Sequence, residues 1–268
     1  MARHSRSLVA PSRIANLSAG TFTILVALAA LIIVSAGQVA PSPDRLARGL
    51  PAMADLVSRM MPPETDPAFL TRMAWRIVET FQIALVGTGI GILLSLPIAW
   101  LAARGVTPLG LGSYLFKALV SLFRTIPDLV WALLFIAAVG LGAVAGTMTI
   151  IVDTIGFCGR FFAEAMEDSD KDPQLALEAH GASRFSILLA AVIPDAMPSM
   201  INTALFALEK AVRSSVVLGL VGAGGIGQEL KVAFDLFQYQ KASAIILSIF
   251  VIVLAMEFAT DRLRARLQ

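Results

Sequence analysis

Cysteine and histidine are scarce in this chain of 268 residues, which contains one cysteine, Cys158, and two histidines, His4 and His180. A single cysteine excludes an intrachain disulfide and a cysteine-rich metal site, and we interpret Cys158 as a buried, inert thiol. The sequence also lacks the phosphate-binding pattern G-x-x-x-x-G-K-[ST] and the zinc-protease pattern H-E-x-x-H. We therefore expect this chain to hold no catalytic residues, no metal and no cofactor of its own.

Charged residues are also few. They make up 15% of the chain, whereas 57% of the residues are hydrophobic and the mean hydropathy is +0.80. Soluble domains carry about 25% charged residues, so the apolar excess indicates an all-α integral membrane protein. The net charge is only +2 and there is no long basic run, which excludes a nucleic-acid partner.

Six apolar runs are long enough to cross a bilayer as helices, which takes about 20 residues. The first follows Arg3, Arg6 and Arg13 and resembles a secretory signal, but it exceeds the usual apolar length of about 7–15 residues, which favours a retained anchor. The predicted spans are 21–39, 80–103, 114–139, 147–168, 195–218 and 242–260.

Six spans place both termini on one side of the membrane, and the distribution of lysine and arginine predicts that this side is the cytoplasm. The cytoplasmic segments then contain Arg3, Arg6, Arg13, Arg104, Lys171, Arg184, Arg262, Arg264 and Arg266. The outer segment 40–76 is an exception because it carries five arginines, Arg45, Arg48, Arg59, Arg72 and Arg76.

The segment between the first two spans has apolar residues at helical spacing, namely Leu46, Leu50, Met53, Val57, Met60 and Met61. This pattern fits an amphipathic helix on the outer membrane surface, while the prolines nearby equally fit an exposed linker. We divide the chain into residues 1–72, an anchor helix with this amphipathic segment, and residues 73–268, the transmembrane domain with a cytoplasmic loop at 169–193.

Glycines occur in two patterns inside the apolar sequence. Gly87 and Gly91 form a GxxxG pair, which allows close helix approach in lipid. Residues 222–227 formally match G-x-G-x-x-G, but they follow a membrane span rather than a soluble strand, which argues against a dinucleotide site. We expect Gly222, Gly224 and Gly225 to form irregular backbone near the outer mouth or gate of a path.

Charged residues inside the spans are the next candidates, because each is costly in lipid and usually faces a partner or an aqueous path. We expect Arg124 and Asp128 to neutralise each other on one helix face in the middle of the third span. Glu209, Lys210 and Arg213 lie in the outer half of the fifth span. Glu209 and Arg213 are four positions apart and can pair, which leaves Lys210 on another face as an unbalanced cation. Arg213, Ser214 and Ser215 suit the passage of an oxyanion; packing ion pairs and snorkelling to the interface are the alternatives.

The cytoplasmic loop 169–193 has the pattern of two short helices separated by a glycine. Asp170 and its polar neighbours can cap a helix over 174–180, Gly181 ends that helix, and a second apolar helix runs over 184–192 to Pro194. This helix–glycine–helix loop predicts a docking surface for another protein.

These residues resemble the permease subunits of bacterial ABC importers, and of phosphonate importers in particular. The resemblance covers about residues 75–265 and rests on the run from Arg124 to Phe135, on Gly181-Ala-Ser183 and on the run from Val217 to Gly227. In the coupling loop of that family, Gly181 and Pro194 are correctly spaced, whereas Leu175 replaces the usual glutamate. The coupling residues implied are Leu175, Ala176, Glu178, Ala179, Gly181, Ala182 and Pro194.

The resemblance implies a type I ABC importer fold, similar to methionine permeases, in the bacterial inner membrane. It implies as partners a second copy of the chain, two cytoplasmic ATPase subunits that bind ATP and Mg, and an extracytoplasmic binding protein that delivers a phosphonate-type oxyanion. Phosphite or inorganic phosphate stays open as the substrate. From another class, a self-sufficient secondary transporter or channel is the alternative; it predicts repeated halves, and none is visible.

Overall fold

The computed structural model describes residues 19–40 and 42–267, and in these residues it contains helices and turns but no strand. The expected all-α class is therefore confirmed. Arg3, Arg6 and Arg13, which contribute to the predicted orientation, lie outside the described residues.

The chain divides into a unit that ends at Val57 and a unit that begins at Ser58. The first unit contains the apolar helix α1 (Ala19–Val39) and most of α2 (Pro43–Met60). The expected amphipathic helix is present, because Leu46, Leu50, Met53 and Val57 lie at helical spacing on α2 and all are exposed. Whether this face binds the outer membrane surface stays a prediction.

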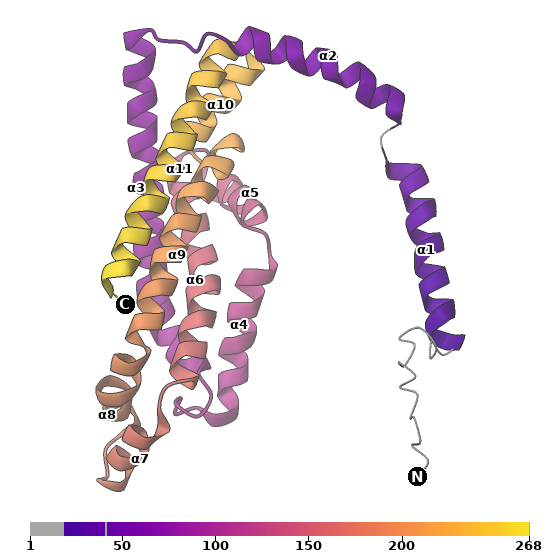
Figure 1. Cartoon of the computed structure of the whole chain (residues 1–268). Helices are drawn as coiled ribbons and strands as arrows, with labels where there is room; N and C mark the ends of the chain where they lie inside the picture. Colours follow the sequence, from indigo (N-terminus) through magenta and orange to yellow (C-terminus); the bar gives the residue numbers. More distant parts are fainter. Residues whose placement is uncertain (1–18, 41, 268) are drawn as a thin grey trace, which may run out of the picture. The chain divides into compact units, whose positions relative to one another are not determined.

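The second unit is a helical bundle with two short helices projecting from one end (Figure 1). Its elements are α3 (Pro67–Ala102), η1 (Gly110–Gly112), α4 (Ser113–Thr125), α5 (Asp128–Val139), α6 (Ala143–Glu167), α7 (Lys171–Ala179), α8 (Arg184–Ile187), η2 (Leu188–Val192), α9 (Ile193–Leu220), α10 (Ile226–Asp235) and α11 (Tyr239–Leu267). Five of the described helices are long and apolar enough to cross a membrane, or six if α4 and α5 form one bent span.

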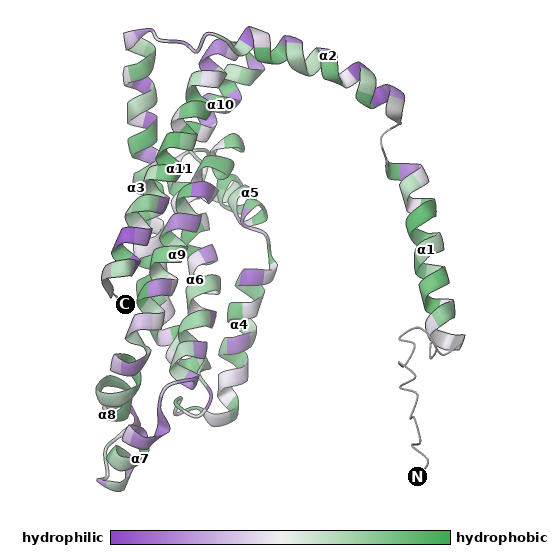
Figure 2. Ribbon diagram, in the orientation of Figure 1, coloured by the Kyte–Doolittle hydropathy of each residue, from purple (hydrophilic) through white to green (hydrophobic). Residues whose placement is uncertain are grey.

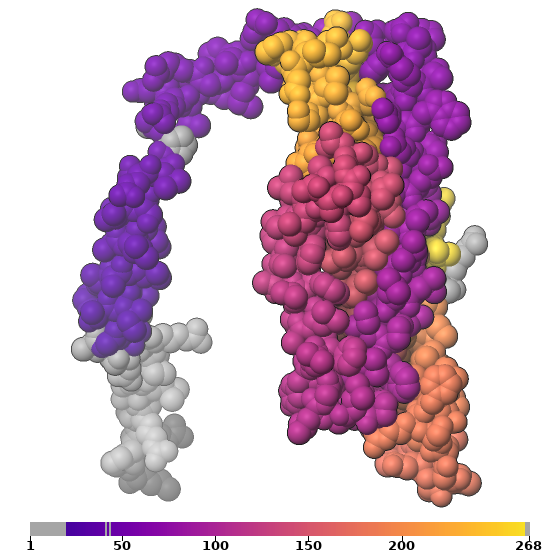
Figure 3. All heavy atoms as spheres, turned by 180° about the vertical axis from the view of Figure 1, so that it is seen from behind, coloured from indigo at the N-terminus to yellow at the C-terminus, as the bar shows by residue number. Residues whose placement is uncertain are grey.

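The most extensive contact between two helices of the bundle joins α3 to α6, and the GxxxG pair lies within it. A Cβ atom on Gly87 would lie 2.7 Å from Ile150 Cγ2, and one on Gly91 would lie 2.5 Å from Thr154 Cβ. Both distances are shorter than those that real Cβ atoms show, so a side chain at either position would require α3 or α6 to shift. Figure 3 shows the helices from α3 to α6 packed against one another without a gap on that face of the bundle.

The expected third span, 114–139, is not one straight helix. α4 and α5 are bent by 88° at a short break, where Ile126 is extended and precedes Pro127. Proline disfavours helical geometry in the residue before it, so the chain turns there. The expectation that Arg124 and Asp128 share one helix face is therefore wrong, because Arg124 lies in the last turn of α4 and Asp128 begins α5.

Two further boundaries differ from the sequence expectation. Residues 67–76 were assigned to an outer segment but form the start of α3, so Arg72 and Arg76 belong to a helix of the bundle. The fifth span is also longer than expected, because α8, the π-helical turn η2 and α9 together form a stretch from Arg184 to Leu220. Pro194 lies just after η2, and a π-helical turn is one of the local rearrangements that accompany a proline within a helical stretch.

Candidate translocation path and coupling loop

The loop between α6 and α9 has the two-helix geometry that the sequence predicts. Asp170 caps α7, since its carboxylate accepts a hydrogen bond from the Asp172 amide at 3.0 Å. Gly181 ends the helix with a φ of +78°, and its amide donates to Glu178 O at 2.9 Å. A side chain at Gly181 would meet nothing within 4 Å, so the glycine is required for its backbone conformation and not for space.

Hydrogen bonds fix this loop to the rest of the bundle. Arg184 Nη1 donates to Thr107 O at 3.0 Å, which ties α8 to the segment after α3. The Asp170 amide donates to Asp195 Oδ2 at 2.8 Å, which ties the start of α7 to α9. The predicted coupling residues Leu175, Ala176, Glu178, Ala179, Gly181 and Pro194 are all exposed, and Ala182 is half-buried. The loop is thus held rigidly while its outer face is free.

The glycine-rich segment lies inside the bundle and not at its surface. All residues from Gly222 to Gly227 are buried, and Gly222, Gly224 and Gly225 have positive φ angles of 98°, 87° and 75°. Gly222 O accepts a hydrogen bond from the Gly142 amide at 2.9 Å, and the Ile226 amide donates to Thr80 Oγ1 at 2.7 Å. The segment is irregular backbone packed against protein, as expected for this depth.

Arg213 and Glu209 form the ion pair that their spacing predicts, with 2.6 Å between Arg213 Nη1 and Glu209 Oε1. Glu209 also contacts Arg264 of α11, at 3.3 Å. Ser214 is half-buried, whereas Ser215 is buried and its hydroxyl donates to Val212 O at 2.9 Å. The two serines therefore differ in accessibility.

The contact of Glu209 with Arg264 indicates where the Glu209–Arg213 pair lies along the bundle. Arg264 belongs to the basic C-terminal segment, and α11 ends partway along the bundle on the side of α7 (Figure 1). If the C terminus is cytoplasmic, Glu209 and Arg213 lie toward the cytoplasmic half of the bundle. This disagrees with their expected place in the outer half of the span.

Lys210 was expected to be an unbalanced cation, and that expectation is wrong. Its ammonium lies 2.7 Å and 2.9 Å from the two carboxylate oxygens of Asp153 on α6. Sequence reasoning missed Asp153, although it is the only charged residue between Asp128 and Arg160. A lone acid inside an apolar span is itself a signal for an intramembrane partner.

Arg124 lies at the end of α4 and is exposed. Among the residues that the structure describes, no carboxylate pairs with it; its guanidinium lies 5.8 Å from the ring centre of Phe161. Asp128 caps the neighbouring amide instead, as Oδ1 accepts from Leu129 N at 2.9 Å. The sequence predicted that Arg124 and Asp128 pair with each other, whereas in the structure each has a different partner.

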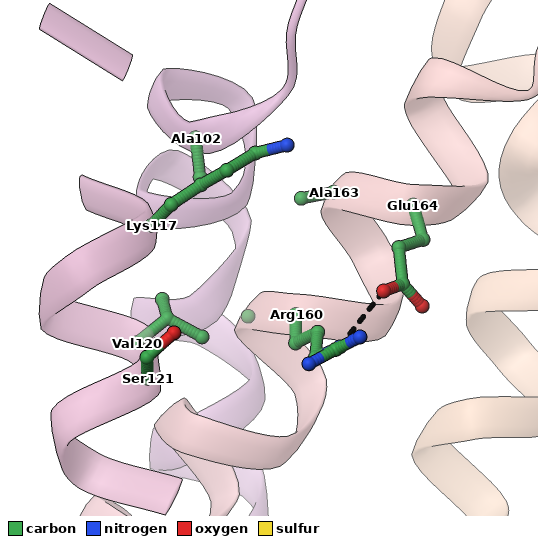
Figure 4. A pocket seen from close by; sticks show the side chains of 8 residues that line it. Ala102, Lys117, Val120, Ser121, Arg160, Ala163 and Glu164 are labelled. Atoms are coloured by element: carbon green, nitrogen blue, oxygen red, sulfur yellow. Dashed lines mark hydrogen bonds and ion pairs between the residues drawn. The ribbon is translucent and has the colours of Figure 1, made fainter. Parts of the chain in front are cut away.

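A pocket of about 190 Å³ opens between α4 and α6 near the coupling loop (Figure 4). Its two cations are both engaged by carboxylates: Arg160 contacts Glu164 at 2.8 Å, and Lys117 contacts Glu167 at 2.7 Å. Because each charge is locally balanced, this pocket is a weaker candidate for an anion than the unpaired Arg124. No cluster of side chains in the described residues is suited to hold a metal ion.

The bundle combines an apolar outer surface with charged residues inside its spans, and Figure 2 shows hydrophilic turns that interrupt α6 and α9. With the projecting helix pair, these features define a multi-pass membrane transport subunit. The sequence model of one family, described as "Binding-protein-dependent transport system inner membrane component", matches residues 95–268. The chain belongs to this family, which overturns the alternative of a self-sufficient secondary transporter or channel.

Similar proteins agree with this assignment. The phosphite transport system permease protein PtxC of Stutzerimonas stutzeri is 36% identical over 221 residues, which cover 82% of this chain and 79% of that protein. The phosphate-import permease protein PhnE of Mycolicibacterium smegmatis is 38% identical over 212 residues, 79% of this chain and 40% of that protein.

Among solved structures, an inward-facing form of the methionine ABC transporter MetNI has a TM-score of 0.66 at 22% identity, covering 76% of this chain and all of that chain. At this identity the likeness establishes the fold alone. The chain therefore has the type I ABC importer permease fold, as expected, and it is a component of the bacterial inner membrane.

Proposed function

We propose that this chain is the permease subunit of an ATP-driven importer of phosphorus oxyanions. Two copies form the path, two separate ATPase subunits bind ATP and Mg at the cytoplasmic face, and an extracytoplasmic binding protein delivers the substrate. The observation that carries the proposal is the similarity to a phosphite permease over most of both chains. Phosphonate, phosphite and phosphate share the tetrahedral oxyanion chemistry that the path would have to accommodate.

The interior charges support a path between two copies. Arg213 keeps 44% of its side chain exposed and Lys210 keeps 35%, although both lie in the long apolar stretch of α9. An arginine or lysine facing hydrocarbon is costly, so this face has to meet water or a second copy. We assign Arg213, Ser214, Arg124 and Asp128 to the path.

The buried glycine segment and Ser215 have a supporting part in the same proposal. Gly222, Gly224 and Gly225 have no side chain, so the segment can pass close to α3 and to the start of α6. Ser215 fixes α9 against α3 through its contact with Thr80 O at 3.4 Å. We propose that this segment acts as the gate that bounds the path.

The coupling loop is the proposed ATPase contact. Leu175 and its exposed neighbours on α7 form an apolar surface that is rigidly connected to α9 and to the segment after α3. Movement of the docked ATPase would then be transmitted to α9 and to the segment after α3. Leu175 stands where the family pattern has a glutamate, which makes the docking surface more apolar, and Glu178 provides a negative charge three positions further on.

Reconstitution of the complete importer tests this function. The permease is co-purified with its ATPase and binding protein, and ATP hydrolysis is measured with methylphosphonate, phosphite, phosphate or sulfate. We expect at least one phosphorus oxyanion, and not sulfate, to stimulate hydrolysis and uptake together. Uptake that proceeds without the ATPase subunits, or no response to any phosphorus oxyanion, would contradict the proposal.

A further inference from the structure

Three phenylalanine rings form a continuous strip across the faces of α6 and α9. Phe157 and Phe161 are one turn apart on α6, with ring centroids 4.8 Å apart, and Phe157 stacks on Phe206 of α9 at 5.6 Å. None of the three rings is fully buried. The strip is therefore an aromatic surface at the level where charged residues interrupt the apolar spans.

Cations from three different helices lie along this strip. Arg124 of α4 is 5.8 Å from the centre of Phe161, and Lys210 of α9 is 5.3 Å from the centre of Phe157. Arg264 of α11 is 6.0 Å from the centre of Phe206. These distances fall within the range of cation–π attraction, about 6 Å. Each ring thus has one positive charge beside it.

The charges around the strip do not cancel. The cations are Arg124, Lys210, Arg213 and Arg264, and the carboxylates that contact them are Asp153, Glu209 and Asp261. Four positive charges face three negative ones, and Arg124 is the cation without a carboxylate among the described residues. A site with one net positive charge favours an anion over a neutral or cationic ligand.

Asp153 is the only carboxylate among the described contacts of Lys210, and it uses both of its oxygens. The pair is part-buried, with 35% of the Lys210 side chain and 19% of the Asp153 side chain exposed. A tetrahedral oxyanion presents oxygen acceptors similar to those of a carboxylate and can accept the same charge-assisted hydrogen bonds. An anion that reaches the exposed side of Lys210 can therefore replace Asp153.

We propose that Lys210 is an anion-binding group in the path and that a phosphorus oxyanion replaces Asp153 as its partner during transport. This inference rests on the proposed function. The oxyanion accepts hydrogen bonds from Lys210 Nζ while Arg124, which lies beside the next ring of the strip, provides the neighbouring positive charge. Asp153 then competes for Lys210 again, which keeps binding weak enough for the anion to leave.

The test compares Asp153→Asn, Lys210→Gln and the double variant with the wild-type complex of permease and ATPase in nanodiscs. Thermal unfolding is followed with increasing potassium methylphosphonate, phosphite or phosphate, with potassium chloride at equal ionic strength as the control. Asp153→Asn leaves Lys210 unpaired, so we expect this variant to have a lower melting temperature than wild type. Oxyanion should raise that melting temperature again, at a concentration about tenfold lower than wild type requires. A tenfold difference is the scale of one charge-assisted hydrogen bond. Lys210→Gln and the double variant lack the ammonium group, so neither should respond to oxyanion at this lower concentration.

Transport assays with the same variants complete the test. Uptake by Lys210→Gln should fall about tenfold, again the scale of one charge-assisted hydrogen bond, and Lys210→Arg, which keeps the charge, should retain more. An exchanged pair, Asp153→Lys with Lys210→Asp, should assemble but not restore uptake, because the cation then lies on α6. Full restoration by the exchange, or equal responses of Asp153→Asn to oxyanion and chloride, would show that the pair is only structural.

The outcomes separate this inference from the proposed function. If wild type imports no phosphorus oxyanion with its ATPase, the proposed function fails. If wild type imports and Lys210→Gln imports equally well, only the role of Lys210 is overturned. Should Lys210→Gln fail to assemble, the thermal response of Asp153→Asn and the uptake of Lys210→Arg decide the question.

Discussion

Arg213 is the residue on which the proposed path can be examined most directly. Replacing it with glutamine removes an arginine fork that would contact two oxyanion oxygens, and we expect uptake to fall about tenfold, as for the loss of one charge-assisted hydrogen bond. Assembly and basal ATP hydrolysis should persist because Glu209 keeps Arg264 as a partner at 3.3 Å. Arg213→Lys should be intermediate, since it retains the charge without the fork. Uptake is measured in proteoliposomes that contain the ATPase and receive the binding protein.

A surface ion pair provides the matched control for this measurement. Lys231 contacts Asp235 at 2.6 Å with both side chains more than half exposed, and such pairs contribute little. Lys231→Gln should therefore transport normally. Wild-type uptake by Arg213→Gln, or its failure to assemble, would make Arg213 a structural residue.

At the scale of single elements, the contact between α3 and α6 depends on Gly91. A leucine there would place its Cβ 2.5 Å from Thr154 Cβ, so α3 and α6 would have to separate. Overpacking of this kind costs about 1–3 kcal/mol, and we expect Gly91→Leu to lower the melting temperature of the purified permease. Gly89 lies on the same helix with nothing within 4 Å, so Gly89→Leu is the control. Equal melting temperatures for the two variants would contradict this packing role.

We expect the proposed role of the coupling loop to depend on one backbone angle, that of Gly181. Gly181→Val places a branched residue at a φ of +78°, a conformation that costs about 1–2 kcal/mol, so the turn between α7 and α8 should shift. We expect a membrane-inserted permease with reduced ATPase co-purification and uncoupled transport.

Gly140 is the corresponding control, because its φ is +92° and nothing lies within 4 Å of it, but it lies outside the coupling loop. Gly140→Val should co-purify with the ATPase as wild type does. Normal ATPase association and uptake by Gly181→Val would remove this loop from the coupling mechanism.

The orientation of the whole protein in the membrane can be tested with fusions. The coupling loop and the end of α11 lie toward the same end of the bundle (Figure 1), and the end of α11 carries the arginines Arg262 and Arg264. We therefore expect a fluorescent protein fused after Gln268 to be fluorescent and an alkaline phosphatase fused there to be inactive. A phosphatase inserted between Gly140 and Gly142 should be active. The reverse pattern would place the loop outside and exclude it as the ATPase contact.

Local patterns in the sequence were enough to predict the class, most of the apolar stretches, the loop of two short helices and the pair of Glu209 with Arg213. These features are local: a run of apolar residues, a glycine at a helix end and a spacing of four residues in one helix define their geometry within a few turns. The same reasoning fails where a helix is interrupted. Arg124 and Asp128 have that spacing too, but the extended Ile126 before Pro127 turns α5 away from α4.

Which charges from distant parts of the sequence meet depends on how the helices pack. Lys210 and Asp153 are separated by 57 positions, and Arg264 and Glu209 by 55. Each pair depends on the depth and rotation at which two helices pack. Those variables follow from contacts such as that of Gly91 with Thr154, where the absence of a side chain permits close approach. The sequence shows that such an approach is permitted, but the choice of partner helix and register results from the combined packing of all the helices.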